Sequence, residues 1–279
     1  MNVTRFAPSP TGLLHLGHAF AAITAFEAGE RFLVRMEDLD QARCRPDYEA
    51  AILDDLRWLT LSFEEPVLRQ SSRFGAYREV LDRLDRRGLL YPCFCTRKEI
   101  ADEIARSAEA PQGPDGPRYP GTCRALPAAE RSRRLAQGAS FALRLDAAGA
   151  AAATGALFFE EEGLGPHGEC GRIAVDPMMA GDVVLARKGM PAAYHLAVAV
   201  DDAFQGVTLV TRGNDLFAAT HVQRVLQALL DLPSPRYAHH RLILDEHGRK
   251  FSKRDKAVTL ASLRAAGVAP QDIRRQLFQ

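Results

Sequence analysis

The first forty residues alternate between two strand-like segments and one helical segment, and this order constrains the fold more than any other feature. Residues 3–7 and 32–36 are short and β-compatible. Residues 17–28 between them carry apolar side chains at near-helical spacing, namely Phe20, Ile23 and Phe26. A strand, a helix and a strand in this order predict a βαβ unit with parallel strands. Because ligands bind at the carboxyl ends of such strands, we expect a nucleotide site at residues 8–18.

The rest of the chain predicts an α/β domain that is interrupted by an insertion. Two amphipathic helices follow the first unit, with apolar stripes formed by Tyr48, Ile52, Leu56 and Leu59, and by Tyr77, Val80, Leu81 and Leu84. Between residue 91 and about residue 150 the pattern breaks into a cysteine-containing knuckle, a Pro/Gly run and a short Arg-rich stretch, and the α/β pattern resumes from residue 181. Strands are then expected at residues 194–200 and 207–211, followed by a helix that bears Val222, Val225, Leu226 and Leu229. The sheet is therefore expected to form from both flanks of the insertion, with one or two short helices at the end of the chain.

Composition limits the partners of the chain. With 279 residues, 47% of them hydrophobic, the chain has enough apolar material for one large domain with an insertion. The 36 Lys and Arg residues nearly balance the 35 Asp and Glu residues, so an RNA partner would need a local basic surface. No apolar run approaches the ~18 residues of a membrane span and no secretory signal begins the chain. We therefore expect a cytoplasmic protein.

The segment PSPTGLLHLGH, from Pro8 to His18, is a candidate anion site. It places His15, Gly17 and His18 at the amino end of the predicted helix, where free N–H groups and the positive end of the helix dipole attract phosphate. Gly17 lets a ligand approach the backbone, and the imidazoles can donate hydrogen bonds to phosphate oxygens. Either histidine alone would equally fit a helix cap or a core position.

A second basic motif, Lys250-Phe251-Ser252-Lys253-Arg254, follows a glycine-started turn. Ammonium groups on such a loop can reach pyrophosphate as negative charge builds on a leaving group. A solvated basic loop is the more common interpretation of an isolated Lys/Arg run.

The cysteines indicate a metal site rather than disulfides. Five cysteines in a chain of this length are too few and too unevenly spaced for a disulfide framework. Thiolates and a phenolate can form a tetrahedral zinc site, and the expected ligands are Cys93, Cys95, Tyr119 and Cys123. Unrelated thiols and a surface tyrosine are the alternative. Cys44 and Cys170 have no obvious partners in the sequence.

Together, the two basic motifs resemble the paired signatures of the class I aminoacyl-tRNA synthetases. This resemblance implies that His15, His18 and Lys253 are catalytic and stabilise the transition state in which a carboxylate displaces pyrophosphate. It implies ATP binding by Pro8, His15, Gly17, His18, Ser252 and Lys253.

Residues 5–12, 35–40 and 211–215 resemble the glutamyl branch of that class. The resemblance implies that glutamate is bound by Arg5, Ala7, Ser9, Glu37, Tyr194 and Arg212. A dicarboxylate with one ammonium needs two cationic partners and one anionic partner, and arginine can contact a carboxylate through two N–H groups. The pattern leaves open which arginine binds which carboxylate. A surface ion pair of Arg5 with Glu37 is the plain alternative.

The cysteine pattern and the chain length are similar to those of a truncated subgroup, the glutamyl-queuosine tRNA(Asp) synthetases. The resemblance implies an α/β fold with a Rossmann-like parallel-sheet catalytic domain in two parts, residues 1–90 and 181–238. Residues 91–180 would form an inserted, zinc-containing subdomain of the acceptor-binding type. Residues 239–279 would form the lysine-signature loop and short C-terminal helices, without an anticodon-binding domain.

The same resemblance implies a ligase that activates L-glutamate with ATP, without requiring tRNA, and transfers it to queuosine in the anticodon of tRNA(Asp). ATP is expected with Mg²⁺, together with one structural zinc per chain, and the protein is expected to be a monomer without a membrane partner. Two alternatives stay open: a conventional glutamyl-tRNA synthetase that charges a tRNA 3′ end, and a catalytically silent RNA-binding paralogue.

Overall fold

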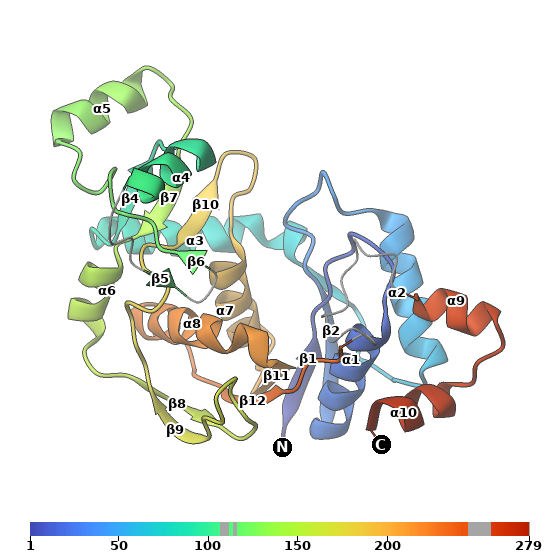
Figure 1. The fold of residues 1–279 in the computed structure, drawn as a ribbon. Helices are drawn as coiled ribbons and strands as arrows, with labels where there is room; N and C mark the ends of the chain where they lie inside the picture. Colours follow the sequence, from blue (N-terminus) through green and yellow to red (C-terminus); the bar gives the residue numbers. More distant parts are fainter. Residues whose placement is uncertain (107–111, 114–115, 245–257, 279) are drawn as a thin grey trace.

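The N-terminal part of the molecule is a parallel three-stranded sheet built on the predicted βαβ unit. The computed structural model describes residues 1–106, 112–113, 116–244 and 258–278 (Figure 1). Strand β1 (Val3–Phe6) pairs in parallel with β2 (Arg31–Met36), and α1 (Leu16–Ala28) is the crossover between them. Strand β3 (Leu68–Arg69) extends the sheet in the order β1-β2-β3.

A second sheet continues the first at the edge of β1. Its strands are β8 (Phe158–Glu161), β9 (Gly171–Ala174), β11 (Leu209–Gly213) and β12 (Arg236–His240), in the order β11-β12-β8-β9. Strands β11, β12 and β8 are parallel, and β9 is antiparallel to β8. The N–H of Thr208 donates to the carbonyl oxygen of Val3 over 3.0 Å, which places β11 beside β1. The carboxyl ends of β1, β2, β11 and β12 consequently open toward one region.

The two helices predicted after the βαβ unit are present, and their apolar stripes face the core. Helix α2 (Pro46–Trp58) buries Ile52 and Leu56, and α3 (Phe74–Arg86) buries Tyr77 and Leu84. The chain turns after α3 at Gly88, whose φ of +67° lies in the left-handed region that favours glycine.

A separate antiparallel sheet forms from β4 (Leu90–Cys93), β7 (Ala142–Leu145) and β10 (Val184–Arg187), which lie in the sequence between β3 and β11. It stands at the upper left in Figure 1 near α4 (Arg97–Arg106) and α5 (Ala128–Ala136), and α6 (Ala147–Thr154) lies below it at the left. A short hairpin of β5 (Gln112–Gly113) and β6 (Gly116–Pro117) accompanies them. Strands β8 and β9 fall within the sequence range expected for the insertion, yet they pair with β12 and with each other.

The predicted strand at residues 194–200 is wrong, because this segment begins helix α7 (Tyr194–Phe204). All residues from Leu196 to Asp202 are buried, and α7 packs against α3, α8 (Phe217–Leu229) and β10. Within the predicted strand, residues 196–200 are apolar without exception, so this run lacks the period that separates a helix from a strand. By contrast, the expected strand at 207–211 and the helix with Val222 and Leu226 correspond to β11 and α8.

Two short helices complete the described chain, as the sequence predicts. Helix α9 (Leu260–Ala265) and helix α10 (Pro270–Phe278) bury Leu260, Ile273 and Leu277 in the core of the N-terminal sheet. Within the described ranges, no helix has the length and apolar character needed to cross a lipid bilayer.

Helix α7 is held to its neighbours by a fully buried carboxylate, Asp201. Its Oδ2 accepts hydrogen bonds from Tyr77 Oη over 2.6 Å and from Gln70 Nε2 over 3.0 Å. Its Oδ1 accepts one from Arg73 Nε over 2.7 Å. Gln70 and Arg73 bound the 3₁₀ helix η1 (Gln70–Arg73), so one carboxylate ties α7 to η1 and α3. Such a charge is stable in the interior because each oxygen has donors.

We expect Tyr77→Phe to lower the free energy of unfolding by about 1–3 kcal/mol, because it removes one donor from a buried carboxylate. Urea denaturation of both proteins measures the difference. The matched control is Tyr48→Phe on the half-exposed side of α2, which should change stability by less than about 0.5 kcal/mol. Equal losses in the two variants would contradict the role assigned to the Tyr77 hydroxyl.

Candidate functional site

A cavity of about 530 Å³ opens at the carboxyl ends of the parallel strands. Its walls include every residue of the predicted ATP and glutamate sites that the structure describes: Arg5, Ala7, Pro8, Ser9, His15, Gly17, His18, Glu37, Tyr194 and Arg212. The predicted residues Ser252 and Lys253 lie outside the described residues. Other residues of the wall had no role assigned from the sequence: Thr211 and Asp215, which lie within the 211–215 motif, and His240.

The two histidines of the first motif lie against each other at the start of α1, with ring centroids 3.8 Å apart. His15 is the N-cap of the helix, and its Nδ1 accepts the backbone N–H of Gly17 over 3.1 Å. The Nδ1 of His18 accepts the backbone N–H of His15 over 3.2 Å. In the neutral form each ring must therefore carry its proton on Nε2, the donor that a phosphate oxygen requires. Capping and anion binding are thus compatible in one pair of side chains.

The packing of His15 explains why glycine occupies position 17. A Cβ atom at this position would lie 3.1 Å from His15 Cε1, closer than ordinary van der Waals contact. The absence of a side chain lets the His15 ring fold over the first turn of α1.

The described residues before the segment 245–257 line the cavity, and those after it contact the segment 14–15. Leu242 and Ile243 line the cavity before this segment. After it, Thr259 forms an antiparallel bridge with His15, and the N–H of Leu260 donates to the carbonyl oxygen of Leu14 over 2.8 Å. The described residues on the two sides of this segment therefore lie at or next to the wall that carries the first motif.

On the β1 side of the cavity, two arginines share one buried carboxylate. Arg5 Nε and Arg35 Nη1 both donate to Asp202 Oδ1, over 3.0 and 2.8 Å. Arg5 Nη1 also donates to the carbonyl oxygen of Thr211 over 3.2 Å. Burial opposes the ionisation of Asp202, yet the two guanidinium groups hold the pKa of Asp202 below its usual range. Arg5 is thereby fixed at the cavity wall.

Glu37 lies beside this group, with its Oε1 3.8 Å from Arg35 Nη2. Burial raises the pKa of Glu37 to about 7, against the lowering influence of Arg35 and Arg5. A carboxylate whose charge is poorly solvated gains from a cationic partner, so Glu37 is suited to hold an ammonium group.

On the β11 side of the cavity, Arg212 is 5% exposed and held by four side chains. Its Nη2 donates to Thr220 Oγ1 over 2.6 Å, and its Nη1 donates to Gln223 Oε1 over 2.8 Å and to Tyr194 Oη over 3.4 Å. Its Nε donates to His239 Nε2 over 3.1 Å. Tyr194 reaches the cavity as the first residue of α7 rather than from a strand.

The partners that hold the arginines were not expected from the sequence. Asp202, Thr220, Gln223 and His239 belong to no motif in the sequence, although each is a buried polar residue. Asp202 alone contrasts with its sequence neighbours, because it lies close to the end of the apolar run 196–200. That contrast was the available signal, since buried polar groups require partners. The partners themselves become apparent only in three dimensions.

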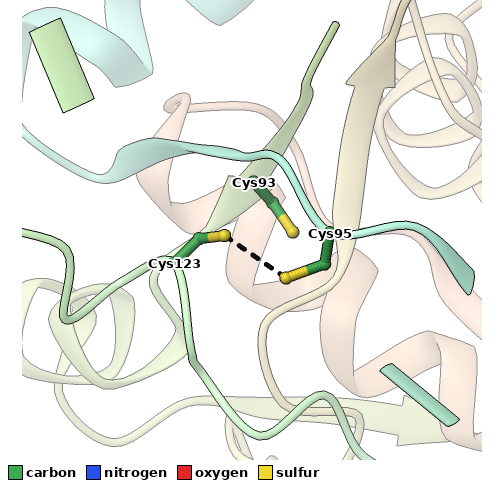
Figure 2. A group of neighbouring side chains, drawn as sticks. All are labelled: Cys93, Cys95 and Cys123. Atoms are coloured by element: carbon green, nitrogen blue, oxygen red, sulfur yellow. Dashed lines mark hydrogen bonds between the residues drawn. The ribbon is translucent and has the colours of Figure 1, made fainter. Parts of the chain in front are cut away.

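Away from this cavity, three predicted metal ligands come together. The sulfur atoms of Cys93, Cys95 and Cys123 all lie within 4.8 Å of one another (Figure 2). Cys95 Sγ is 3.4 Å from Cys123 Sγ and 3.6 Å from Tyr119 Oη. Sulfur ligands of a tetrahedral zinc ion lie roughly 3.8 Å apart, given Zn–S bonds of about 2.3 Å. The spacing of the donors therefore fits a metal ion.

The tyrosine hydroxyl also accepts the backbone N–H of Cys123 over 2.8 Å. Burial and the neighbouring Cys123 thiol raise the pKa of Cys95 to about 12. Three thiolates packed this closely need a cation between them, because their charges repel one another. Cys93, Cys95 and Cys123 form a cluster that could bind a metal.

Comparison with known proteins identifies the family of this chain. The family model of the class I tRNA synthetases (E and Q), catalytic domain, matches residues 2–279. The chain is 51% identical to the glutamyl-Q tRNA(Asp) synthetase of Rhodobacter capsulatus, over 98% of each chain. It is 46% identical to the protein of the same name from Nocardia farcinica, over 96% of this chain and 81% of that one.

Among solved structures, the chain resembles a glutamate tRNA ligase from Elizabethkingia meningosepticum in complex with its amino acid, with a TM-score of 0.71 and 26% identity. The match covers 91% of this chain, and the chain spans about half of that protein, 52%. The parallel α/β framework and the match over the whole chain agree: this protein belongs to the class I tRNA synthetases of the glutamyl and glutaminyl group.

Proposed function

We propose that this protein activates L-glutamate with ATP, without requiring tRNA, and transfers the glutamate to queuosine in the anticodon of tRNA(Asp). The observation that carries the proposal is the single cavity that combines two held arginines, Glu37 and the histidine pair at the start of α1. Its charges match a dicarboxylate with one ammonium, next to a place for phosphate.

Glutamate would lie between the two sides of the cavity. Arg5 and Arg212 would each bind one carboxylate, and Glu37 would bind the ammonium group. Ala7, Ser9 and Tyr194 would complete the pocket, since all three line the same cavity. Because the guanidinium groups are already held by protein partners, little side-chain entropy would be lost when glutamate binds.

ATP would lie along Pro8, Gly17 and the histidine pair. In the reaction, an α-carboxylate oxygen of glutamate attacks the α-phosphorus, the bond to the β-phosphate oxygen breaks, and pyrophosphate leaves. Nε2–H groups of His15 and His18 would donate to phosphate oxygens as negative charge develops. Ser252 and Lys253 would act on the same phosphates from the second motif. Magnesium, when bound, would neutralise phosphate charge.

The acceptor is the finer part of the proposal and rests on the relatives. Relatives named glutamyl-Q tRNA(Asp) synthetase are covered over 81–98% of their length, whereas proteins named glutamate–tRNA ligase are 37–38% identical and are covered over 56–57% of theirs. Both names share glutamate and tRNA, and the first specifies the modified base.

Pyrophosphate exchange into ATP tests the activation step. We expect exchange with glutamate alone among the amino acids, in the absence of RNA, and a loss of at least a hundredfold in Lys253→Ala, because the ammonium is assigned to the leaving phosphates. Labelled glutamate should then appear on tRNA(Asp) that carries queuosine, but not on tRNA(Asp) that lacks it. Labelling of the 3′ end of tRNA(Glu) would favour a conventional synthetase, and absence of any exchange would exclude activation.

The raised pKa of Glu37 gives the activation step a pH dependence. Below about pH 7 Glu37 becomes protonated and loses its attraction for the ammonium group, so kcat/KM for glutamate should fall by about tenfold per pH unit. Steady-state pyrophosphate exchange between pH 5.5 and 8 measures this fall, the acidic limb of the pH profile of kcat/KM. Glu37→Gln should lower kcat/KM at pH 8 and remove the limb, while KM for ATP changes little. An unchanged limb in Glu37→Gln would assign the titration to another group.

We propose that the cysteine cluster holds one structural zinc, with Tyr119 as the fourth ligand. Elemental analysis of the purified protein should give about one zinc per chain, and Cys123→Ser should lose most of it, because three ligands without the fourth hold zinc less tightly. Cys44→Ser, in the loop before α2, is the matched control and should keep full zinc. Substoichiometric zinc in the wild-type protein purified from zinc-supplemented cells would contradict the assignment.

A further inference from the structure

A buried chain of three charged or titratable groups runs from β8 to the cavity. Glu161 at the end of β8 and His239 on β12 have side chains that are completely buried, and the His239 Nδ1 lies 2.5 Å from Glu161 Oε2. The other ring nitrogen, Nε2, lies 3.1 Å from Arg212 Nε. The order is therefore carboxylate, imidazole, guanidinium.

The hydrogen bonds determine the protonation state of His239. An arginine Nε always carries a hydrogen, so the His239 Nε2 must accept and cannot carry a proton. The Nδ1 must then carry the ring proton and donate to Glu161, which is an acceptor on both oxygens. The hydroxyl of Thr220, 3.4 Å from Nε2, is a second neighbour that can donate to the same nitrogen. Burial lowers the pKa of His239, in agreement with a neutral ring.

We propose that Glu161 and His239 are positioning residues for amino-acid binding: Glu161 fixes the Nδ1–H tautomer of His239, and this tautomer fixes the orientation of the Arg212 guanidinium. The inference rests on the proposed function in so far as Arg212 binds a substrate carboxylate. Neither residue lines the cavity, so both act through Arg212.

The geometry around Glu161 allows a sharp test with an isosteric change. Its Oε1 accepts two backbone N–H groups, from His239 over 2.8 Å and from Gly163 over 2.9 Å. In Glu161→Gln the amide oxygen must therefore take this position, because an NH₂ group there would face two donors. The NH₂ group then faces Nδ1, which must give up its proton and become the acceptor. The proton moves to Nε2 and opposes the N–H of Arg212.

Substitution of His239 separates the two contacts. His239→Gln can place an amide oxygen near the former Nε2 and keep an acceptor for Arg212. His239→Asn is shorter, so it keeps a polar group near Glu161 and leaves Arg212 Nε without its partner. His221→Asn is the matched control, since His221 is also buried and accepts the Asp176 N–H through Nδ1, but does not contact Arg212.

Two measurements on the full chain decide the proposal. The first is ¹⁵N NMR of histidine-labelled protein without substrate, which reports the tautomer of His239. We expect Nδ1–H in the wild-type protein and Nε2–H in Glu161→Gln. The second is pyrophosphate exchange: KM for glutamate should rise by about tenfold or more in Glu161→Gln and His239→Asn, and by much less in His239→Gln. KM for ATP should stay within about twofold in all variants, and His221→Asn should resemble the wild type.

Each failure has a distinct meaning. An Nε2–H or doubly protonated His239 in the wild-type protein would overturn the proposal, and so would an unchanged KM for glutamate in Glu161→Gln after the tautomer has moved. Absence of exchange in the wild-type protein would overturn the proposed function instead. The NMR result would then still decide whether Glu161 sets the tautomer that Arg212 contacts.

Discussion

Two adjacent carboxylates on α7, Asp201 and Asp202, connect this helix to α3 and η1 on one side and to β1 and β2 on the other. Asp201 accepts from Tyr77 and its neighbours on the α3 side, whereas Asp202 accepts from Arg5 on β1 and Arg35 on β2. Because consecutive helical residues project about 100° apart, one helix can serve both directions. The cavity depends on this arrangement, since its β1 wall has a fixed shape only while Asp202 holds Arg5.

The sequence was sufficient where a segment has one apolar face or a chemical motif. The stripes on α2 and α3 were predicted because each of these helices is exposed on one side and so keeps its period. The βαβ unit was predicted from the order of its segments, although β1 and β2 are buried. Helix α7 was misassigned because it is buried all round, and β8 was not predicted because its pairing with β12 depends on residues nearly eighty positions later in the chain.

In the candidate site, the residues that would face a ligand were predicted and the residues that hold them were not. His15, His18 and Arg212 belong to short sequence motifs, and their chemistry can be predicted from those motifs alone. Their support comes from distant strands and helices: Glu161 precedes its partner His239 by 78 positions, and Asp202 is separated from Arg5 by 197. Local patterns carry no information about such pairs, which arise from the topology of the sheet.

The place of β1 beside β11 also has a consequence for synthesis of the chain. Val3 N donates to Thr208 Oγ1, a contact between residues 205 positions apart. The β1 edge of the first sheet therefore stays without its neighbour until most of the chain has been made. At a translation rate of about 5–20 residues per second, that interval is on the order of ten to forty seconds. An unpaired strand edge can pair with other chains. The outermost strand of the nascent βαβ unit thus becomes an interior strand only when β11 arrives.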